Sequence, residues 1–225
     1  MSGRLEGRLA LVTGASRGIG YAVAKRFAAE GAHVVAVART QGGLEELDDE
    51  VRRGGHGSCT LHPLDLNDFD AIDRMAAALH ERFGKLDVAV GNAAILPSLS
   101  PVGHVEIAVF EAIQRVNFVA NWRLLRALDP LLRRASAGRA IFTTCDAAHA
   151  AEPYWGAYAA SKAALEALVR AYAAEVANTP VRARLVNPGP VRTRLRLNAF
   201  PAEDTSRLPL PDQVAELFVA AASAQ

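Results

Sequence analysis

Residues 9–20 of the chain, LALVTGASRGIG, join a short apolar run to a glycine-rich turn that opens a helix. Glycines at positions 14, 18 and 20 permit a tight turn, a close approach of the backbone to a pyrophosphate, and close packing of helix on strand. The start of the helix adds unpaired N–H groups and the positive end of its dipole. No Gly-Lys-Ser/Thr follows, so the loop is not of the Walker type. The segment predicts a dinucleotide-binding unit and not a glycine turn that serves packing alone.

The same alternation of a short apolar run and a longer helical pattern continues along the chain. The run VVAVA at 34–38 is continuously apolar, as expected for a strand covered on both faces. Six strands joined by helical crossovers predict a doubly wound, Rossmann-type α/β fold, a parallel sheet with helices on both faces, in one domain over residues 1–225. Strands are expected at 9–13, 33–38, 59–64, 86–90, 140–144 and 181–186, and helices at 21–30, 44–53, 69–83, 107–134, 158–178 and 212–222.

Composition excludes several classes of protein. The 225 residues include 25 Lys and Arg against 24 Asp and Glu, and no long run of either sign occurs, which argues against a nucleic-acid or anionic-membrane partner. Two cysteines in a chain of this length favour a reducing compartment. The first residues, MSGRLEGR, carry charges where an export signal would be apolar, and no stretch is long and apolar enough to span a membrane. We therefore expect a cytoplasmic protein.

The second predicted strand ends at Arg39, about 20 residues beyond the glycines, where an acidic residue would hydrogen-bond a ribose 2′-hydroxyl. No acid stands there. Arg39 and Arg17 can instead hold a 2′-phosphate, because guanidinium groups match phosphate oxygens bidentately. Each arginine alone would be interpreted as a solvated surface group. Together with the missing acid, they predict a preference for NADP(H) over NAD(H).

Tyr158 and Lys162 lie in an alanine-rich helical stretch, and their i to i+4 spacing puts both on one face. A free phenol, with a pKa of about 10, is a poor acid–base catalyst at neutral pH. An adjacent ammonium would lower that pKa, so that Tyr158 could donate a proton to a carbonyl oxygen or remove one from an alcohol. A lone Tyr-x-x-x-Lys is common on helix surfaces. After the fifth strand of a dinucleotide-binding fold, it predicts an oxidoreductase with a small-molecule carbonyl or alcohol substrate.

These landmarks resemble the short-chain dehydrogenase/reductase family from about residue 5 to residue 222, and look most like an uncharacterised bacterial subgroup. The matching stretches are TGASRGIG at 13–20, LDL at 64–66, NA at 92–93, Asn117, the Tyr158 and Lys162 pair, and NPGPVRT at 187–193. The resemblance implies that Asp65 binds the adenine, Asn92 lines the adenosine side, and Thr193 holds the nicotinamide carboxamide. It also implies that Asn117 maintains a proton relay through Lys162, which binds the nicotinamide ribose as well. The cofactor-binding set is then Gly14, Ser16, Arg17, Gly18, Ile19, Gly20, Arg39, Asp65, Leu66, Asn92, Ala93, Tyr158, Lys162, Pro188, Gly189, Val191 and Thr193.

Position 145 departs from the family. The catalytic serine lies thirteen residues before the tyrosine, and this chain has Cys145 there. A thiol is a weak hydrogen-bond donor, and loss of one such donor costs on the order of 10² to 10³ in rate, so weakened activity is expected. Thr144 could replace the hydroxyl if the chain leaves the sheet at that residue, whereas Thr143 lies roughly 6.6 Å deeper. A Cys145 thiolate with His149 as its base is a less favoured alternative to a small, unreactive buried thiol.

Other motifs lead to weaker expectations. The segment 195–211 has the length and position of a substrate lid. His56-x-x-Cys59-x-x-His62 resembles a metal-ligand spacing, but an odd separation on a strand points Cys59 and His62 to opposite faces, so no metal is assigned.

The sequence also leads to expectations about oligomeric state and to a second hypothesis about activity. The resemblance implies a homodimer through the helices around 107–134 and 158–178. The chain stops before the family's usual seventh strand, which favours a six-stranded sheet and a dimer over a tetramer. The rival to an enzyme is a dinucleotide-binding sensor or scaffold with little turnover; Cys145 favours it, whereas the intact Tyr158, Lys162 and Asn117 favour the enzyme.

Overall fold

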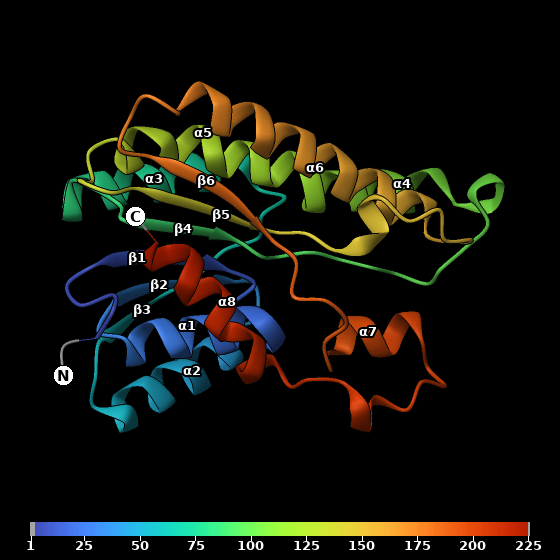
Figure 1. Ribbon diagram of the computed structural model, residues 1–225, viewed down its shortest axis with the longest axis horizontal. Coiled ribbons are helices and arrows are strands. Elements are labelled where there is room, and N and C mark those ends of the chain that lie inside the picture. The colour runs from blue at the N-terminus through green and yellow to red at the C-terminus, as the bar shows by residue number, and fades with distance from the viewer. Residues whose placement is uncertain (1–2, 225) are drawn as a thin grey trace.

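The structure, a computed structural model, describes residues 3–224 and is built around one six-stranded sheet (Figure 1). The strand order is β3-β2-β1-β4-β5-β6, and every neighbouring pair is parallel. The predicted doubly wound fold is therefore confirmed. The strands are β1 (Leu9–Thr13), β2 (His33–Ala38), β3 (Ser58–Pro63), β4 (Val88–Gly91), β5 (Arg139–Thr143) and β6 (Arg182–Val186).

Helices cover both faces of the sheet, and two further helices lie beyond one end of it (Figure 1). One face carries α1 (Gly18–Ala29), α2 (Gln41–Gly54) and α8 (Pro211–Ser223), and the other carries α3 (Phe69–Phe83), α5 (Ala120–Leu132) and α6 (Gly156–Glu175). Beyond the carboxyl ends of the strands lie α4 (Ile107–Gln114) and the short α7 (Arg194–Ala199). Within residues 3–224, no helix combines the length and hydropathy that a membrane span requires.

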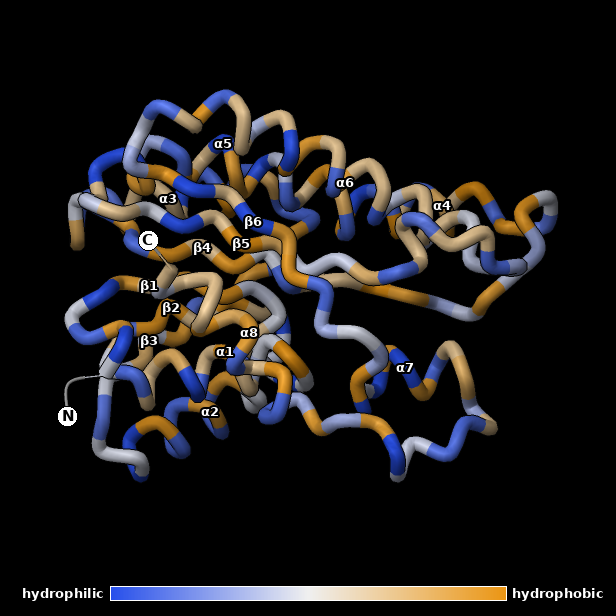
Figure 2. Tube along the Cα trace, viewed as in Figure 1, coloured by the Kyte–Doolittle hydropathy of each residue, from blue (hydrophilic) through white to orange (hydrophobic). Residues whose placement is uncertain are grey.

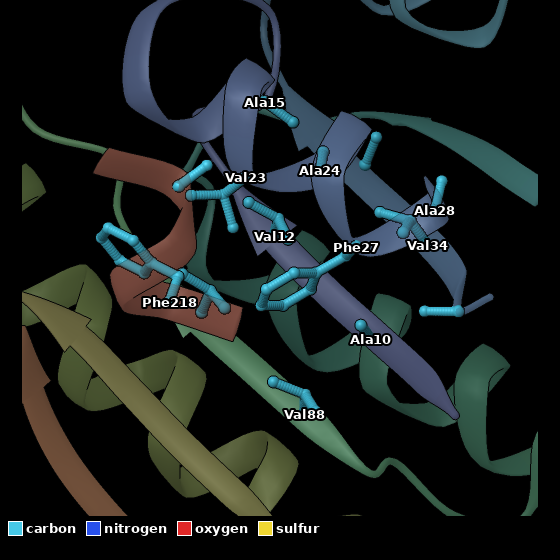
Figure 3. Close-up of a cluster of buried hydrophobic side chains, with 14 of the residues drawn as sticks. Ala10, Val12, Ala15, Val23, Ala24, Phe27, Ala28, Val34, Val88 and Phe218 are labelled. Atoms are coloured by element: carbon cyan, nitrogen blue, oxygen red, sulfur yellow. The ribbon is translucent and has the colours of Figure 1, made fainter. Parts of the chain in front are cut away.

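The core divides into two layers because successive strand residues point to opposite faces. On β1, Ala10 and Val12 face the α1 and α8 side, whereas Leu9 and Leu11 face the α3 and α5 side. Figure 2 shows mostly hydrophobic residues along the central strands and a mixture of hydrophobic and hydrophilic residues along the helices around them. In the first layer, Phe27 of α1 and Phe218 of α8 are fully buried (Figure 3). Truncating either ring to alanine would cost about 3–5 kcal/mol of stability.

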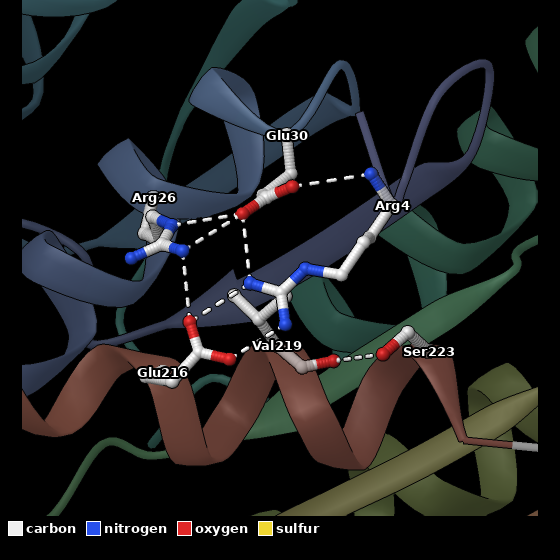
Figure 4. A network of polar contacts seen from close by, with 6 residues as sticks. All are labelled: Arg4, Arg26, Glu30, Glu216, Val219 and Ser223. Atoms are coloured by element: carbon white, nitrogen blue, oxygen red, sulfur yellow. Dashed lines mark hydrogen bonds and ion pairs between the residues drawn. The ribbon is translucent and has the colours of Figure 1, made fainter. Parts of the chain in front are cut away.

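A network of charged side chains ties α8 to α1 and to the segment before β1 (Figure 4). Arg4 donates to Glu30 at 2.8 Å and to both carboxylate oxygens of Glu216 at 2.6 and 2.8 Å. Arg26 also donates to Glu30 and Glu216, at 2.8 Å each. Each carboxylate therefore bridges two guanidinium groups, and the network fixes α8 against α1.

The predicted helix over 107–134 is wrong as a single α-helix. It is divided by a π-helical turn at Arg115–Val119, which separates α4 from α5. Asn117, at the centre of this turn, is fully buried; its side chain accepts from the Ile95 N–H at 2.8 Å and donates to the Ile95 carbonyl at 3.0 Å. Such single-turn π segments often occur at functional sites. The division follows from anchoring Asn117 to the loop after β4.

Candidate active site

The glycine loop between β1 and α1 packs against the loop after β4. Gly14 has a φ of 70°, in the left-handed region that favours glycine. A side chain at Gly20 would place its Cβ 2.4 Å from the Gly14 carbonyl oxygen and 2.5 Å from Asn92 Nδ2. The close packing predicted for this loop is present, and these two positions require glycine.

The first turn of α1 is open to an anionic ligand. Arg17 is the N-cap residue, and its side chain makes no capping hydrogen bond. The first N–H groups of a helix lack intrahelical partners, and with the helix dipole they favour a phosphate. The loop therefore fits the pyrophosphate of a dinucleotide.

Arg39 and Asp65, both predicted to lie near the adenosine, are brought together at the ends of β2 and β3. Arg39 Nη1 is 3.9 Å from Asp65 Oδ2, with the two side chains 60% and 47% exposed. Asp65 Oδ1 also accepts from the Asn67 backbone and side chain at 2.9 and 3.0 Å. Leu66 is buried in the core layer under α3. Arg39 is thus an exposed cation at the expected place, held near one carboxylate.

Asn92 joins the ends of three strands. Its side chain donates to the Thr13 carbonyl at 3.1 Å and accepts from the Thr143 hydroxyl at 3.3 Å. The Thr13 hydroxyl accepts from the N–H groups of Asn92 and Ala93 at 3.0 and 3.1 Å. This bonding fixes the relative position of the glycine loop and the carboxyl end of β5.

Tyr158 and Lys162 lie together near the carboxyl end of β5, 6% and 3% exposed. Lys162 Nζ donates to the Thr143 carbonyl at 2.8 Å and lies 5.7 Å from the centroid of the Tyr158 ring. Burial lowers the pKa of Lys162 to about 8. Burial, followed by the neighbouring Cys145 thiol, raises the pKa of Tyr158 above its usual range. Desolvation therefore outweighs the lowering that was expected from the ammonium.

The two threonines before Cys145 do not supply a hydroxyl to Tyr158. Thr144 stays in register with the sheet, since its N–H donates to the Val186 carbonyl at 2.9 Å. Its hydroxyl donates to Glu166 Oε1 at 2.6 Å, away from Tyr158, while the Thr143 hydroxyl is bound to Asn92. The hypothesis that Thr144 replaces the serine is therefore wrong. Cys145 itself stands beside Tyr158.

His149 does not form a pair with Cys145. Its Nε2 lies 2.7 Å from Glu166 Oε2, and no hydrogen bond joins it to Cys145 within residues 3–224. Glu166 is 2% exposed and also binds Arg170. This buried carboxylate therefore has three side-chain partners: Thr144, His149 and Arg170. Sequence reasoning missed Glu166, although its position four residues after Lys162 on one helix face was a usable signal.

Asn117 reaches the site through a neighbour of Lys162. Its Nδ2 is 3.2 Å from the hydroxyl oxygen of Ser161, which itself donates to the Tyr158 carbonyl at 2.7 Å. The backbone carbonyl of Asn117 accepts from Asn121 Nδ2 at 2.8 Å. The buried Ser161 and Asn121 were not anticipated from the sequence.

The segment after β6 returns to the glycine loop. A Cβ on Gly18 would lie 3.6 Å from the Thr193 methyl group, so Thr193 is next to that loop. Thr193 also caps α7, accepting from the Arg196 N–H at 3.2 Å. Val191 is buried, and Gly189, with a φ of 68°, donates its N–H to Asn187 Oδ1 at 2.9 Å. Pro188, Gly189, Val191 and Thr193 thus follow β6 at the carboxyl end of the sheet.

A cavity of about 210 Å³ has Tyr158 in its wall. The remaining walls come from the loop after β4, from α4 and from the loop that precedes α6. Trp155 lies between this cavity and α7, since its ring is 5.7 Å from that of Tyr158 and 5.6 Å from that of Phe200, centroid to centroid. Part of the predicted lid, 195–211, therefore packs next to Tyr158.

The second cysteine lies away from this site. Cys59 on β3 packs against the core layer under α1 and α2, and burial raises its pKa to about 12. No three His, Cys, Asp or Glu side chains in the described part of the chain are grouped as they would be around a metal ion.

Comparison with known proteins supports one family. The sequence pattern of the family described as short chain dehydrogenase matches residues 8–204. The chain is 32% identical over 217 residues to an uncharacterized oxidoreductase, YciK, of Escherichia coli strain K12, covering 96% of this chain and 86% of that protein.

Solved structures give the same assignment. A short chain dehydrogenase from Pseudomonas syringae matches with a TM-score of 0.95 and 35% identity, over 99% of this chain and 91% of that one. A short chain dehydrogenase from Escherichia coli CFT073, solved in complex with NADPH, matches with a TM-score of 0.92 and 31% identity, over 99% and 93% of the two chains. The chain belongs to the short-chain dehydrogenase/reductase family of oxidoreductases.

Proposed function

We propose that the protein is an NADP(H)-dependent oxidoreductase that interconverts a carbonyl compound and an alcohol, in one catalytic domain over residues 1–225. The observation that carries the proposal is the burial of Tyr158 and Lys162, one helical turn apart, at the end of β5. The uncapped start of α1 and the glycines before it supply the matching cofactor site.

Three groups of residues would hold the cofactor. The glycine loop surrounds the pyrophosphate, Arg17 and Arg39 bind the 2′-phosphate, and NADPH in the Escherichia coli CFT073 relative supports that preference. Bound NADP(H) supplies or accepts the hydride. The assigned residues are Gly14, Ser16, Arg17, Gly18, Ile19 and Gly20 for the pyrophosphate, Arg39, Asp65, Leu66, Asn92 and Ala93 for the adenosine half, and Tyr158, Lys162, Pro188, Gly189, Val191 and Thr193 for the nicotinamide half.

Tyr158 is the general acid in carbonyl reduction. Its raised pKa keeps the hydroxyl protonated at neutral pH, ready to donate to a carbonyl oxygen as negative charge develops there. The Lys162 ammonium, 5.7 Å from the Tyr158 ring centroid, offsets the charge left on the phenolate and binds the ribose. Asn117 holds the π turn and the loop after β4 in place through Ile95.

Cys145 takes the place of the family's serine beside Tyr158. Its thiol polarises the substrate oxygen less than a hydroxyl would, so turnover is slower than with serine. This departure is also the observation that favours the second candidate, a dinucleotide-binding sensor or scaffold with little turnover.

Two structural features complete the proposal. The segment 195–211, which includes all but the first residue of α7, acts as a lid, supported by the packing of Phe200 on Trp155. The protein forms a homodimer through α4, α5 and α6, supported by the exposed Phe110 and Trp122 on the first two of these helices.

The test measures cofactor binding first and turnover second. NADPH and NADH are titrated by fluorescence, and NADPH oxidation is then followed with a panel of aldehydes, ketones and quinones for the natural protein and for Cys145→Ser. NADPH binding with turnover supports the enzyme. Binding without turnover, restored by the serine, supports the sensor or scaffold. Failure to bind either nucleotide overturns both.

A further inference from the structure

The cavity beside Tyr158 is apolar where it is deep. Leu96 and Ile113 are buried in its wall, and Leu99, Val105, Val109 and Trp155 extend this surface. Such walls accept the hydrocarbon body of a ligand, while a few polar groups set its orientation. Since Tyr158 is the proton donor in the proposed function, the carbonyl of a substrate would be held at the Tyr158 end.

The orientation of the cavity follows from α4. Gln114, at the carboxyl end of α4, donates through Nε2 to the Ala157 carbonyl at 2.9 Å, which anchors that end of the helix beside Tyr158. Glu106, the N-cap residue of α4, lies eight residues earlier, or about 12 Å along the helix axis. Ile113 is buried, so the cavity has an inner end at Tyr158. Its mouth is formed by the exposed lining residues Glu106, Ser98, His104 and Tyr154.

The mouth carries negative charge without a cation to offset it. Glu106 is the only Asp, Glu, Lys or Arg among the described residues that line the cavity; His104, Ser98 and Ser100 are the other polar residues besides the two tyrosines. Glu106 forms no ion pair with any residue between 3 and 224.

Resting on the proposed function, we propose that the substrates are aldehydes or ketones with an apolar body of about ring size, and that Glu106 selects a neutral or cationic group at the far end against an anionic one. A carboxylate, phosphate or other anion at the mouth would meet like charge, whereas a quaternary ammonium group would meet its opposite. Glu106 is thus a specificity-determining residue, not a catalytic one.

The test uses three benzaldehydes that carry a para-propyl chain ending in tert-butyl, trimethylammonium or carboxylate. The first two have the same shape, and the quaternary ammonium cannot condense with an aldehyde. NADPH oxidation is measured at pH 7.5. The natural protein is compared with Glu106→Gln and with Glu111→Gln, which removes an equal charge from an exposed position of α4 outside the cavity.

Exposed ion pairs are weak, so the expected change is moderate. Glu106→Gln should lower the ratio of kcat/KM for the cationic aldehyde to that for the anionic aldehyde about tenfold. About threefold comes from a lower kcat/KM for the cationic aldehyde, and about threefold from a higher kcat/KM for the anionic one. The tert-butyl compound should react equally well with all three proteins, and Glu111→Gln should leave the ratio within about twofold. An unchanged ratio in Glu106→Gln, or an equal change in both variants, overturns the inference about Glu106. Turnover of the aldehydes would still support the proposed oxidoreductase activity. If none of the aldehydes consumes NADPH although the panel of the previous section does, the inference alone fails; if nothing does, both fail.

Discussion

At position 145, sulfur in place of oxygen determines the expected rate of carbonyl reduction. The Thr143 and Thr144 hydroxyls are bound to Asn92 and Glu166, so the Cys145 thiol is the remaining donor beside Tyr158. Since loss of an oxyanion donor costs about 10² to 10³ in rate and a thiol retains part of its effect, Cys145→Ser should raise kcat for carbonyl reduction about ten- to a hundredfold. Steady-state kinetics with NADPH checks this. Cys59→Ala, far from the site, is the control, and a serine variant no faster than the natural protein contradicts the argument.

Arg39 should control the choice between the two nicotinamide cofactors. It is exposed at the end of β2 and only loosely paired with Asp65, so its fork is free to bind a 2′-phosphate. Loss of a charged hydrogen bond is worth about 1.5–3 kcal/mol, so Arg39→Ala should raise the Kd for NADPH roughly ten- to a hundredfold and leave that for NADH nearly unchanged. Fluorescence titration measures both. Arg53→Ala, which removes another exposed arginine, is the control, and an equal loss for both cofactors would refute the assignment.

The buried Lys162 sets an upper pH limit for reduction. Because burial lowers its pKa to about 8, the ammonium is present below that pH and is lost above it, whereas Tyr158 stays protonated because its pKa is raised. We expect kcat/KM for reduction to be level between about pH 6 and 7.5 and to fall above pH 8, while alcohol oxidation, which needs the phenolate, rises with pH. A pH profile in both directions is the measurement. A reduction rate that stays level to pH 10 would exclude this role for Lys162.

At the scale of elements, the α8 contact depends on the ionisation of Glu30. The Arg4 hydrogen bond, together with Arg26, lowers the pKa of Glu30 to about 2. This stabilisation is therefore present above about pH 4.5, the ordinary range of a carboxyl, and is lost as the pH falls towards 2. Glu30→Gln should lower the free energy of unfolding at pH 7 by about 1 kcal/mol and reduce its loss between pH 7 and pH 3. Urea titrations at both pH values test this, with the exposed Glu81→Gln as the control.

Elements with a strong local pattern could be predicted from the sequence, and those set by distant contacts could not. Alternation of apolar runs and helical patterns predicted β1, β2 and α3 residue for residue. The π turn around Asn117 escaped because its cause is a bond to Ile95, twenty-two positions away. The six-residue α7 escaped because so short a helix depends on packing and not on periodicity.

The candidate site divides in the same way. Spacing within one helix or one loop placed the glycines, Tyr158 and Lys162, because these neighbours are local in the chain. Side-chain partners were beyond the sequence: the Thr144 hydroxyl turns to Glu166, and Lys162 turns to the Thr143 carbonyl. The sign of the Tyr158 pKa shift also depended on burial, which spacing does not report.

At the scale of the whole molecule, α5 and α6 present a surface suited to a second copy of the chain. Trp122 on α5 is 42% exposed, and on α6 the outward positions are mostly alanine, which lets helices approach closely. Large exposed aromatic side chains are enriched at interfaces. Alanines 160, 163, 167, 171 and 174 are the exposed small residues of α6.

The proposed dimer is tested by a substitution that leaves the fold of one subunit undisturbed. Ala167 is exposed on α6, so Ala167→Arg adds a solvated side chain to a monomer but a buried, unpaired charge to a dimer interface, at a cost of several kcal/mol. Light scattering coupled to size exclusion should give twice the chain mass for the natural protein and the chain mass for this variant at micromolar concentration, with unchanged circular dichroism. Ala220→Arg, at an exposed position of α8, should remain dimeric. A monomeric natural protein would contradict the proposed dimer. An Ala167→Arg variant that still dimerises would show that the interface lies elsewhere.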